Sequence, residues 1–218
     1  IIFLNQELLR HSKFTNTVSN KLLVAHNGFD EDFISERPIN NGGKIVFVGS
    51  LTRFNEDRGI KILIDAFGNQ EIKNQYSLTI VGGPEEEALE LKKYILSNNV
   101  DAEINIVGPK ARSEISKYLR DANIGILLNT SLNIHSYLFS SPLKYFEYLY
   151  MGLKVIGVDF PSHRALPRNN EINFFQENDI YSFETAVKQA LEKNQPVDVN
   201  KEGFSLNTRA KKIISFLQ

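Results

Sequence analysis

The stretch that decides the fold reads KIVFVGS at residues 44–50, GIKILIDAFGN at 59–69 and SLTIVGG at 77–83. The first and third segments are short apolar runs rich in β-branched residues, which is typical of strands buried on both faces. The middle segment has the length and apolar spacing of a helix. A strand, a helix and a second strand in this order form a βαβ unit, and such units build a parallel sheet.

The same alternation continues toward the carboxyl end of the chain. Further strands are predicted at 103–109, 123–131, 153–159 and, as a short element, 172–175. Further helices are predicted at 85–99, 112–122, 141–151, 180–193 and 205–217. We therefore predict an α/β fold with a Rossmann-like parallel sheet and helices on both of its faces.

Composition narrows the class of protein. The 218 residues include 25 Lys and Arg against 26 Asp and Glu, so net charge gives no indication of a nucleic-acid partner. There is no cysteine, which excludes a disulfide framework and thiolate metal sites. The chain does not begin with methionine, and we expect it to be part of a longer protein. Because 35–44 is rich in turn residues, we expect a remnant or linker over 1–36 and one domain over 37–218.

Glycine and polar residues follow each of the first four predicted strands. They are Gly49-Ser50, Gly82-Gly83-Pro84, Gly108-Pro109-Lys110 and Asn129-Thr130-Ser131, the last leading into a loop that contains His135. Ligands of open parallel sheets bind at the carboxyl ends of the strands, and glycine allows close approach to the backbone. The alternative is that each glycine only makes a tight turn. The sequence shows neither GxGxxG after the first strand nor a Walker lysine motif.

Two charges interrupt the apolar helix in SSPLKYFEYLYMGLKVIGVD, residues 140–159. We predict Ser141 as its N-cap, Pro142 at the first helical position and Gly152 just after its end. Lys144 in the first turn opposes the helix dipole, unless an anion binds there. Glu147 lies one turn on and, if buried, needs hydrogen-bond donors such as ligand hydroxyls. The alternative is a surface ion pair between the two side chains.

These motifs, in this order, resemble the donor-binding, C-terminal half of GT-B glycosyltransferases, most closely retaining glycosyltransferase family 4 (glycosyl transferases group 1). The resemblance covers about residues 24–217. It rests on VAHNGFD (24–30), IVFVGSLTRFNEDRGIKILIDAF (45–67), LTIVGGPEEEALELKKY (78–94), INIVGPKARSEISKYLRDANIGILLNTS (104–131), SSPLKYFEYLYMGLKVIGVD (140–159) and FSLNTRAKKIISFL (204–217).

The resemblance implies roles for individual residues. Glu147 is expected to bind the ribose hydroxyls of a nucleotide, and the helix start is expected to face its diphosphate. Arg58 matches the lysine of the family's Lys-Gly segment, and Arg53 is the candidate for the family's arginine; with Lys144 they form the expected catalytic set. The expected nucleotide- and sugar-binding residues are Gly49, Ser50, Gly108, Pro109, Lys110, His135, Ser140, Ser141, Pro142, Leu143 and Glu147. No metal or other cofactor is expected.

This sequence departs from the family's pattern in the E-x7-E motif. The first glutamate of that motif falls on Phe139, so the sugar contact of that glutamate is absent or displaced.

The resemblance also implies a function and partners. The substrates are a nucleotide-diphosphate sugar, such as a UDP- or GDP-sugar, and a saccharide or lipid-linked acceptor, and the sugar is transferred with retention. The chain would be inactive alone, because the acceptor domain that precedes it in the family is missing. The alternatives are a GT-B sugar-nucleotide 2-epimerase and a non-catalytic nucleotide-sugar-binding module. We expect a role in polysaccharide biosynthesis and a cytoplasmic location, with peripheral membrane association at the inner face through the missing domain.

Overall fold

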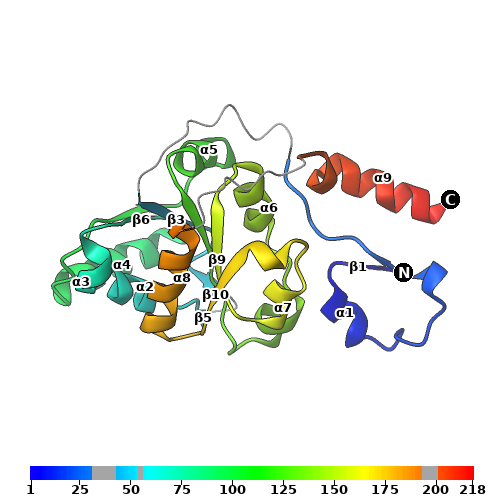
Figure 1. The fold of residues 1–218 in the computed structure, drawn as a ribbon, viewed down its shortest axis with the longest axis horizontal. Coiled ribbons are helices and arrows are strands. Elements are labelled where there is room, and N and C mark those ends of the chain that lie inside the picture. Colours follow the sequence, from blue (N-terminus) through cyan, green and yellow to red (C-terminus); the bar gives the residue numbers. More distant parts are fainter. Residues whose placement is uncertain (31–42, 54–55, 193–200) are drawn as a thin grey trace.

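The computed structural model describes residues 1–30, 43–53, 56–192 and 201–218, and its centre is a six-stranded sheet (Figure 1). The strands run in the spatial order β10 (Ile172–Phe175), β9 (Lys154–Val158), β8 (Ile124–Leu127), β3 (Lys44–Val48), β6 (Ser77–Val81) and β7 (Ile104–Gly108). Every neighbouring pair is parallel. The predicted α/β fold is confirmed, and the chain changes direction across the sheet between β3 and β8.

Helices cover both faces of this sheet (Figure 1). The sheet therefore separates two hydrophobic cores, one on each face. One face packs against α2 (Ile60–Gly68), α3 (Gln70–Lys73), α4 (Glu85–Ser97) and α8 (Ile180–Glu192). The other packs against α5 (Arg112–Arg120) and α6 (Leu143–Tyr150). Strand β3 supplies both cores, since Ile45 and Phe47 point to the first and Val46 and Val48 to the second, as the twofold period of a strand requires.

Strands β3 and β8 separate before they reach the carboxyl edge. They pair only at Ile45–Ile124 and Val46–Gly125. Beyond that point the Tyr148 hydroxyl of α6 lies between them, accepting from the Val48 amide at 3.1 Å and donating to the Ile126 carbonyl at 3.4 Å. A Cβ on Gly125 would lie 2.4 Å from the Tyr148 ring. Glycine in β8 therefore lets α6 approach closely, and the tyrosine holds the two strands apart.

Several shorter elements complete the domain. The chain after β3 forms a small hairpin of β4 (Thr52–Arg53) and β5 (Glu56–Asp57). The long loop predicted after β8 contains a π-helical turn, η3 (His135–Phe139), and α7 (Pro161–Arg164) and η4 (Asn169–Glu171) lie between β9 and β10.

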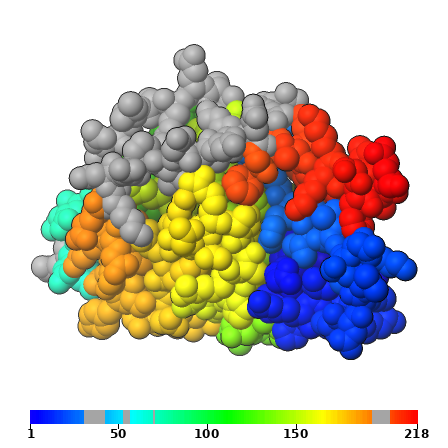
Figure 2. Space-filling view, turned by 45° about the vertical axis from the view of Figure 1, so that its right-hand side comes forward, coloured from blue at the N-terminus to red at the C-terminus, as the bar shows by residue number. Residues whose placement is uncertain are grey.

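The two ends of the chain pack together beside the sheet (Figures 1 and 2). The N-terminal segment, residues 1–30, contains β1 (Ile2–Phe3), α1 (Gln6–Arg10), η1 (Ser19–Lys21) and β2 (Leu23–Val24), and β1 pairs with β2. At the other end, η5 (Lys201–Phe204) leads into α9 (Leu206–Leu217). Lys212 of α9 donates to the Val24 carbonyl at 3.2 Å. The predicted boundary between residues 36 and 37 falls outside the described residues and stays a prediction.

Candidate functional site

The candidate site is the region at the carboxyl edge of the sheet where β3 and β8 part, a crevice in the topological sense used for parallel α/β sheets. Gly49 and Ser50 follow β3, Asn129 follows β8, and α6 begins beside them. A Cβ on Gly82 would lie 1.8 Å from the Gly49 carbonyl oxygen, so the loops after β3 and β6 touch backbone to backbone. This close approach requires glycine, and it leaves the rim of the crevice lined by main chain.

Lys144 is buried beside the end of β3. Its side chain is 9% exposed, and its Nζ lies 4.0 Å from the centre of the Phe47 ring, within the range of a cation–π contact. A Cβ on Gly49 would lie 3.3 Å from the same Nζ. The second residue of α6 thus holds a buried positive charge against the end of β3, beside the start of its own helix.

Glu147 lies one turn further along α6 and is 5% exposed. Its Oε1 accepts a hydrogen bond from Arg112 Nη1 at 3.0 Å. Burial raises the pKa of Glu147 above its ordinary value, although Arg112 and Lys144 act in the opposite direction. The hydrogen-bond donors to Glu147 were predicted to be hydroxyls of a ligand. In the structure Arg112, at the start of α5, supplies one of these donors.

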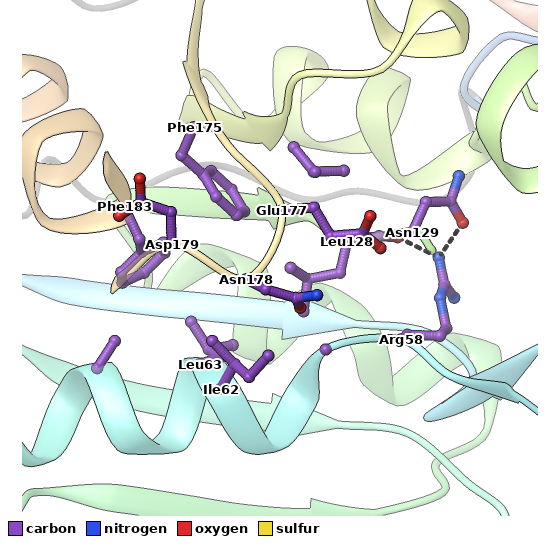
Figure 3. Close-up of a pocket in the computed structure, with 13 residues that line it drawn as sticks. Arg58, Ile62, Leu63, Leu128, Asn129, Phe175, Glu177, Asn178, Asp179 and Phe183 are labelled. Atoms are coloured by element: carbon purple, nitrogen blue, oxygen red, sulfur yellow. Dashed lines mark hydrogen bonds between the residues drawn. The ribbon is translucent and has the colours of Figure 1, made fainter. Parts of the chain in front are cut away.

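Arg58 is buried and reaches across the crevice from the chain before α2. Its guanidinium donates to the Ser50 carbonyl at 3.1 Å. It also donates to Asn129 Oδ1 at 3.0 Å and to the Leu128 carbonyl (Figure 3). These bonds tie the loop after β3 to the end of β8. The structure therefore places Arg58 in the crevice and engages it with protein oxygens. The side chain of Arg53 lies outside the part of the chain that the structure describes.

Asn129 connects several parts of the site; its place at a strand end was predicted, but no binding role was assigned to it. Besides accepting from Arg58, its Nδ2 donates to the Ser136 carbonyl at 3.1 Å and to Ser140 Oγ at 2.9 Å. One buried amide thus links the arginine, the π-helical turn and the residues before α6. A polar residue at the end of an apolar strand is the sequence signal for a site residue, and Asn129 carries that signal.

A pocket opens beside Arg58, on the face of the sheet opposite α6 (Figure 3). It is a small cavity of about 30 Å³ between α2 and α8. Leu63, Phe175 and Phe183 give it apolar walls, and Arg58 and Glu177 lie among its polar residues. The crevice therefore borders an apolar recess as well as the charged helix start.

The start of α6 differs from the prediction. Pro142 is the N-cap and Leu143 the first helical residue, so the expected Ser141 N-cap is wrong by one position. The Ser141 Oγ instead accepts a hydrogen bond from the backbone N–H of Asn27 at 3.4 Å. Within the described residues no side chain caps α6, which leaves its first N–H groups and the positive end of its dipole directed out of the helix. The prediction for Gly152 is confirmed, since it follows the C-cap with φ +64°.

The remaining predicted residues lie around this centre. Gly108 has φ +80° and ends β7, followed by exposed Pro109 and Lys110. The same loop leads to Arg112, which connects it to Glu147. Ser140 is buried, Leu143 is exposed, and His135 is exposed with its ring edge-on to Phe139 at 5.5 Å.

Phe139 and His163 are two further features of the site region. His11 also contacts the Phe139 ring, at 5.7 Å, so an aromatic cluster stands where the family resemblance places a glutamate.

His163 is fully buried, with its Nδ1 2.8 Å from the Val158 carbonyl. Burial, reinforced by Lys144 and Arg58, lowers the pKa of His163 to about 4. The imidazole is therefore neutral near pH 7.

The described residues contain neither a cluster of metal ligands nor a membrane-spanning helix. No group of three or more His, Cys, Asp or Glu side chains in these residues could hold a metal ion. Over the same ranges, no helix has the length and apolar character needed to cross a membrane.

The fold matches that of GT-B glycosyltransferase domains among the solved structures. Sucrose-phosphate synthase from Thermosynechococcus elongatus matches with a TM-score of 0.71 at 16% identity, over 99% of this chain and 57% of its own. Anabaena Alr3699/HepE in complex with UDP and glucose matches with 0.71 at 15%, over 99% and 62%. The lipopolysaccharide outer core galactosyltransferase WaaB matches with 0.69 at 13%, over 99% and 60%. At these identities the likeness shows the fold alone.

The chain spans about three fifths of the length of these structures. No curated protein matches it in sequence. The sequence model of the glycosyl transferases group 1 family matches residues 42–193, which is more than half of the chain. The chain belongs to the glycosyl transferases group 1 family.

Proposed function

We propose that the chain is the donor-binding part of a retaining glycosyltransferase of family 4. The whole enzyme transfers a sugar from a nucleotide-diphosphate sugar to a saccharide or lipid-linked acceptor. One observation carries the proposal: Lys144 and Glu147 are buried on α6 where the two central strands separate. Ligands of open parallel sheets bind where neighbouring strands separate at the carboxyl edge, and a nucleotide diphosphate offers negative charge to Lys144 and ribose hydroxyls to Glu147.

The proposed roles follow from the position of each group. The diphosphate lies at the uncapped start of α6, where the helix N–H groups and Lys144 meet its charge. The carboxylate of Glu147, oriented by Arg112, accepts the ribose hydroxyls. Arg58 holds the loop after β3 against β8 and adds positive charge to the crevice. The loop Gly108–Lys110 lies beside the base.

The chemical step is proposed as a displacement in which atoms and electrons balance. The bond between the anomeric carbon and the β-phosphate oxygen breaks, and its electron pair stays on that oxygen. The acceptor hydroxyl oxygen bonds to the anomeric carbon on the same face, and its proton passes to the departing diphosphate. The charge that develops on the diphosphate is stabilised by groups already in place, namely Lys144 and the N–H groups of α6.

A non-catalytic nucleotide-sugar-binding module is the second candidate. The observation that favours it is Phe139, held between His11 and His135 where the family's first glutamate would stand. Sugar transfer by the longer protein to a saccharide or lipid-linked acceptor would exclude this candidate. We expect no transfer by the 218-residue chain alone.

A thermal-shift screen of UDP, GDP, ADP and their sugars tests the proposal. A ligand at 100 times its Kd stabilises the folded chain by about 2.7 kcal/mol, which raises Tm by roughly 5–10 °C for a chain of this size. We expect one nucleotide base to give such a shift and uncharged sugars to give none. If no nucleotide changes Tm at millimolar concentration, the proposed function is wrong.

A further inference from the structure

Asn5 connects the N-terminal segment to the start of the candidate site. It is fully buried, although it lies in a part of the chain outside the sheet. Its Oδ1 accepts from the Leu8 amide at 2.8 Å and caps α1, and its Nδ2 donates to the Ser140 carbonyl at 3.0 Å. One amide side chain thus fixes a short helix of the N-terminal segment and a peptide group two residues before the N-cap of α6.

Asn27 makes the equivalent contact one residue later. Its Nδ2 donates to the Ser141 carbonyl at 2.6 Å, and its own amide donates to Ser141 Oγ at 3.4 Å. Two asparagines from the N-terminal segment therefore hold two consecutive carbonyl groups. Both carbonyls belong to the residues that lead directly into α6.

These bonds orient the backbone that leads to the proposed diphosphate. A trans peptide directs its C=O and the next N–H to opposite sides, so a Ser140 carbonyl turned toward Asn5 turns the Ser141 N–H away from it. Both carbonyls carry partial negative charge, and Asn5 and Asn27 engage them on the side of the N-terminal segment. If either carbonyl turned toward the crevice, it would repel a phosphate.

The same residues connect to the other side of the crevice. Ser140 Oγ accepts from Asn129, whose Oδ1 accepts from Arg58. A continuous series of hydrogen bonds therefore runs from Arg58 through Asn129 and Ser140 to Asn5. In this series of hydrogen bonds, Asn5 is the donor that comes from the N-terminal segment. Its amide both donates to Ser140 and accepts from Leu8.

We propose that Asn5 and Asn27 are positioning residues of the nucleotide-diphosphate site. They contact the backbone before α6 and set the direction of the groups that meet phosphate. This inference rests on the proposed function, and it assigns part of the donor site to the N-terminal segment rather than to the sheet domain.

Two serine variants and one control separate positioning from stability. Asn5→Ser keeps a good cap for α1 but is too short to reach Ser140, and Asn27→Ser removes the donor to Ser141. Asn98→Ser is the matched control, because Asn98 also donates its amide to a backbone carbonyl, that of Tyr94 at 2.9 Å, at an exposed helix end. NMR titration of each 15N-labelled chain with UDP and with uridine measures two affinities by one method. GDP and guanosine replace them if the wild-type chain prefers guanine.

We expect each of the two variants to bind UDP about tenfold more weakly, because each loses one hydrogen bond, buried for Asn5 and partly buried for Asn27, that orients charge-binding groups. Uridine has no phosphate, so its affinity should stay within about twofold of wild type, and Asn98→Ser should change neither affinity. Equal losses of affinity for UDP and for uridine would overturn this inference but not the proposed function. Unchanged UDP affinity in both variants would do the same. If the wild-type chain binds neither UDP nor GDP, the proposed function fails and the inference fails with it.

Discussion

Helices α5 and α6 both begin at the carboxyl edge of the sheet, and each carries a glutamate and a lysine three residues apart. In α5, Glu114 and Lys117 are exposed, lie 3.9 Å apart and place the acid first, as the helix dipole favours. In α6, the lysine comes first and both Lys144 and Glu147 are buried. Equal spacing in the sequence thus gives a solvated surface pair in one helix and two enclosed charges in the other.

The difference lies in what surrounds each pair. The α5 pair contributes what an exposed ion pair contributes, a few tenths of a kcal/mol. The α6 pair stands against Phe47 and Arg112, where removal from water costs several kcal/mol per ion before compensation. Sites that bind ligands retain such destabilising charges. The comparison therefore fits the proposal that α6, and not α5, contributes charges to ligand binding.

The largest expected effect comes from Glu147→Ala. Losing a carboxylate that accepts hydrogen bonds from ribose removes about 1.5–3 kcal/mol of binding, so UDP or GDP should bind roughly 10- to 100-fold more weakly by isothermal titration. Glu114→Ala in α5 is the control and should leave binding unchanged. Equal affinities for wild type and Glu147→Ala would remove the basis for distinguishing the two helices.

Lys144→Met should separate binding from stability. Methionine keeps the length of the side chain and removes a buried charge, so we expect Tm to stay the same or rise, while UDP affinity falls about tenfold through the lost phosphate contact. Calorimetry for Tm and titration for binding measure both. A lower Tm with unchanged UDP affinity would mean that Lys144 is a structural charge.

The third prediction concerns pH and is expected to be smaller. Ribose hydroxyls bind the ionised form of Glu147. The pKa of Glu147 lies above its ordinary value, because the effect of burial, together with Asp30, exceeds the opposite effect of Arg112 and Lys144. Donor affinity should therefore fall as pH decreases through this raised pKa, starting at a higher pH than for an ordinary glutamate at 4.5. A UDP-sugar is the suitable ligand, because its diphosphate has no proton to lose in this range. Glu147→Gln should bind weakly at every pH, and a wild-type affinity that is independent of pH would contradict the assignment.

Lys117→Met gives the smallest expected effect. The exposed ion pair of α5 is lost, and the free energy of unfolding should change by no more than about 0.5 kcal/mol. Nucleotide affinity should not change. A loss of binding comparable to that of Lys144→Met would show that the two helices do not differ in function.

The sequence predicts the fold and the centre of the site because both depend on local patterns. Continuous apolar runs identify the six strands, and an apolar helix with two charges identifies Lys144 and Glu147 as enclosed. Gly152 is predictable in the same way, since a residue at positive φ after a helix favours glycine. These features need only neighbours within a few positions.

The rest of the site depends on contacts between distant parts of the chain. Arg112 reaches Glu147 from 35 positions away, and Asn5 reaches Ser140 from 135. The Ser141 hydroxyl caps no N–H of α6 and contacts Asn27, 114 positions away, instead. Serine before a proline and an apolar helix is a sound signal for a cap, but tertiary hydrogen bonds compete for the same oxygen.

A crystal structure of the chain with UDP tests the central claim most directly. We predict that the diphosphate lies at the start of α6 within hydrogen-bonding distance of its N–H groups and near Lys144, and that the ribose hydroxyls contact Glu147. UDP bound elsewhere on the chain, with the crevice between β3 and β8 unoccupied, would contradict the account.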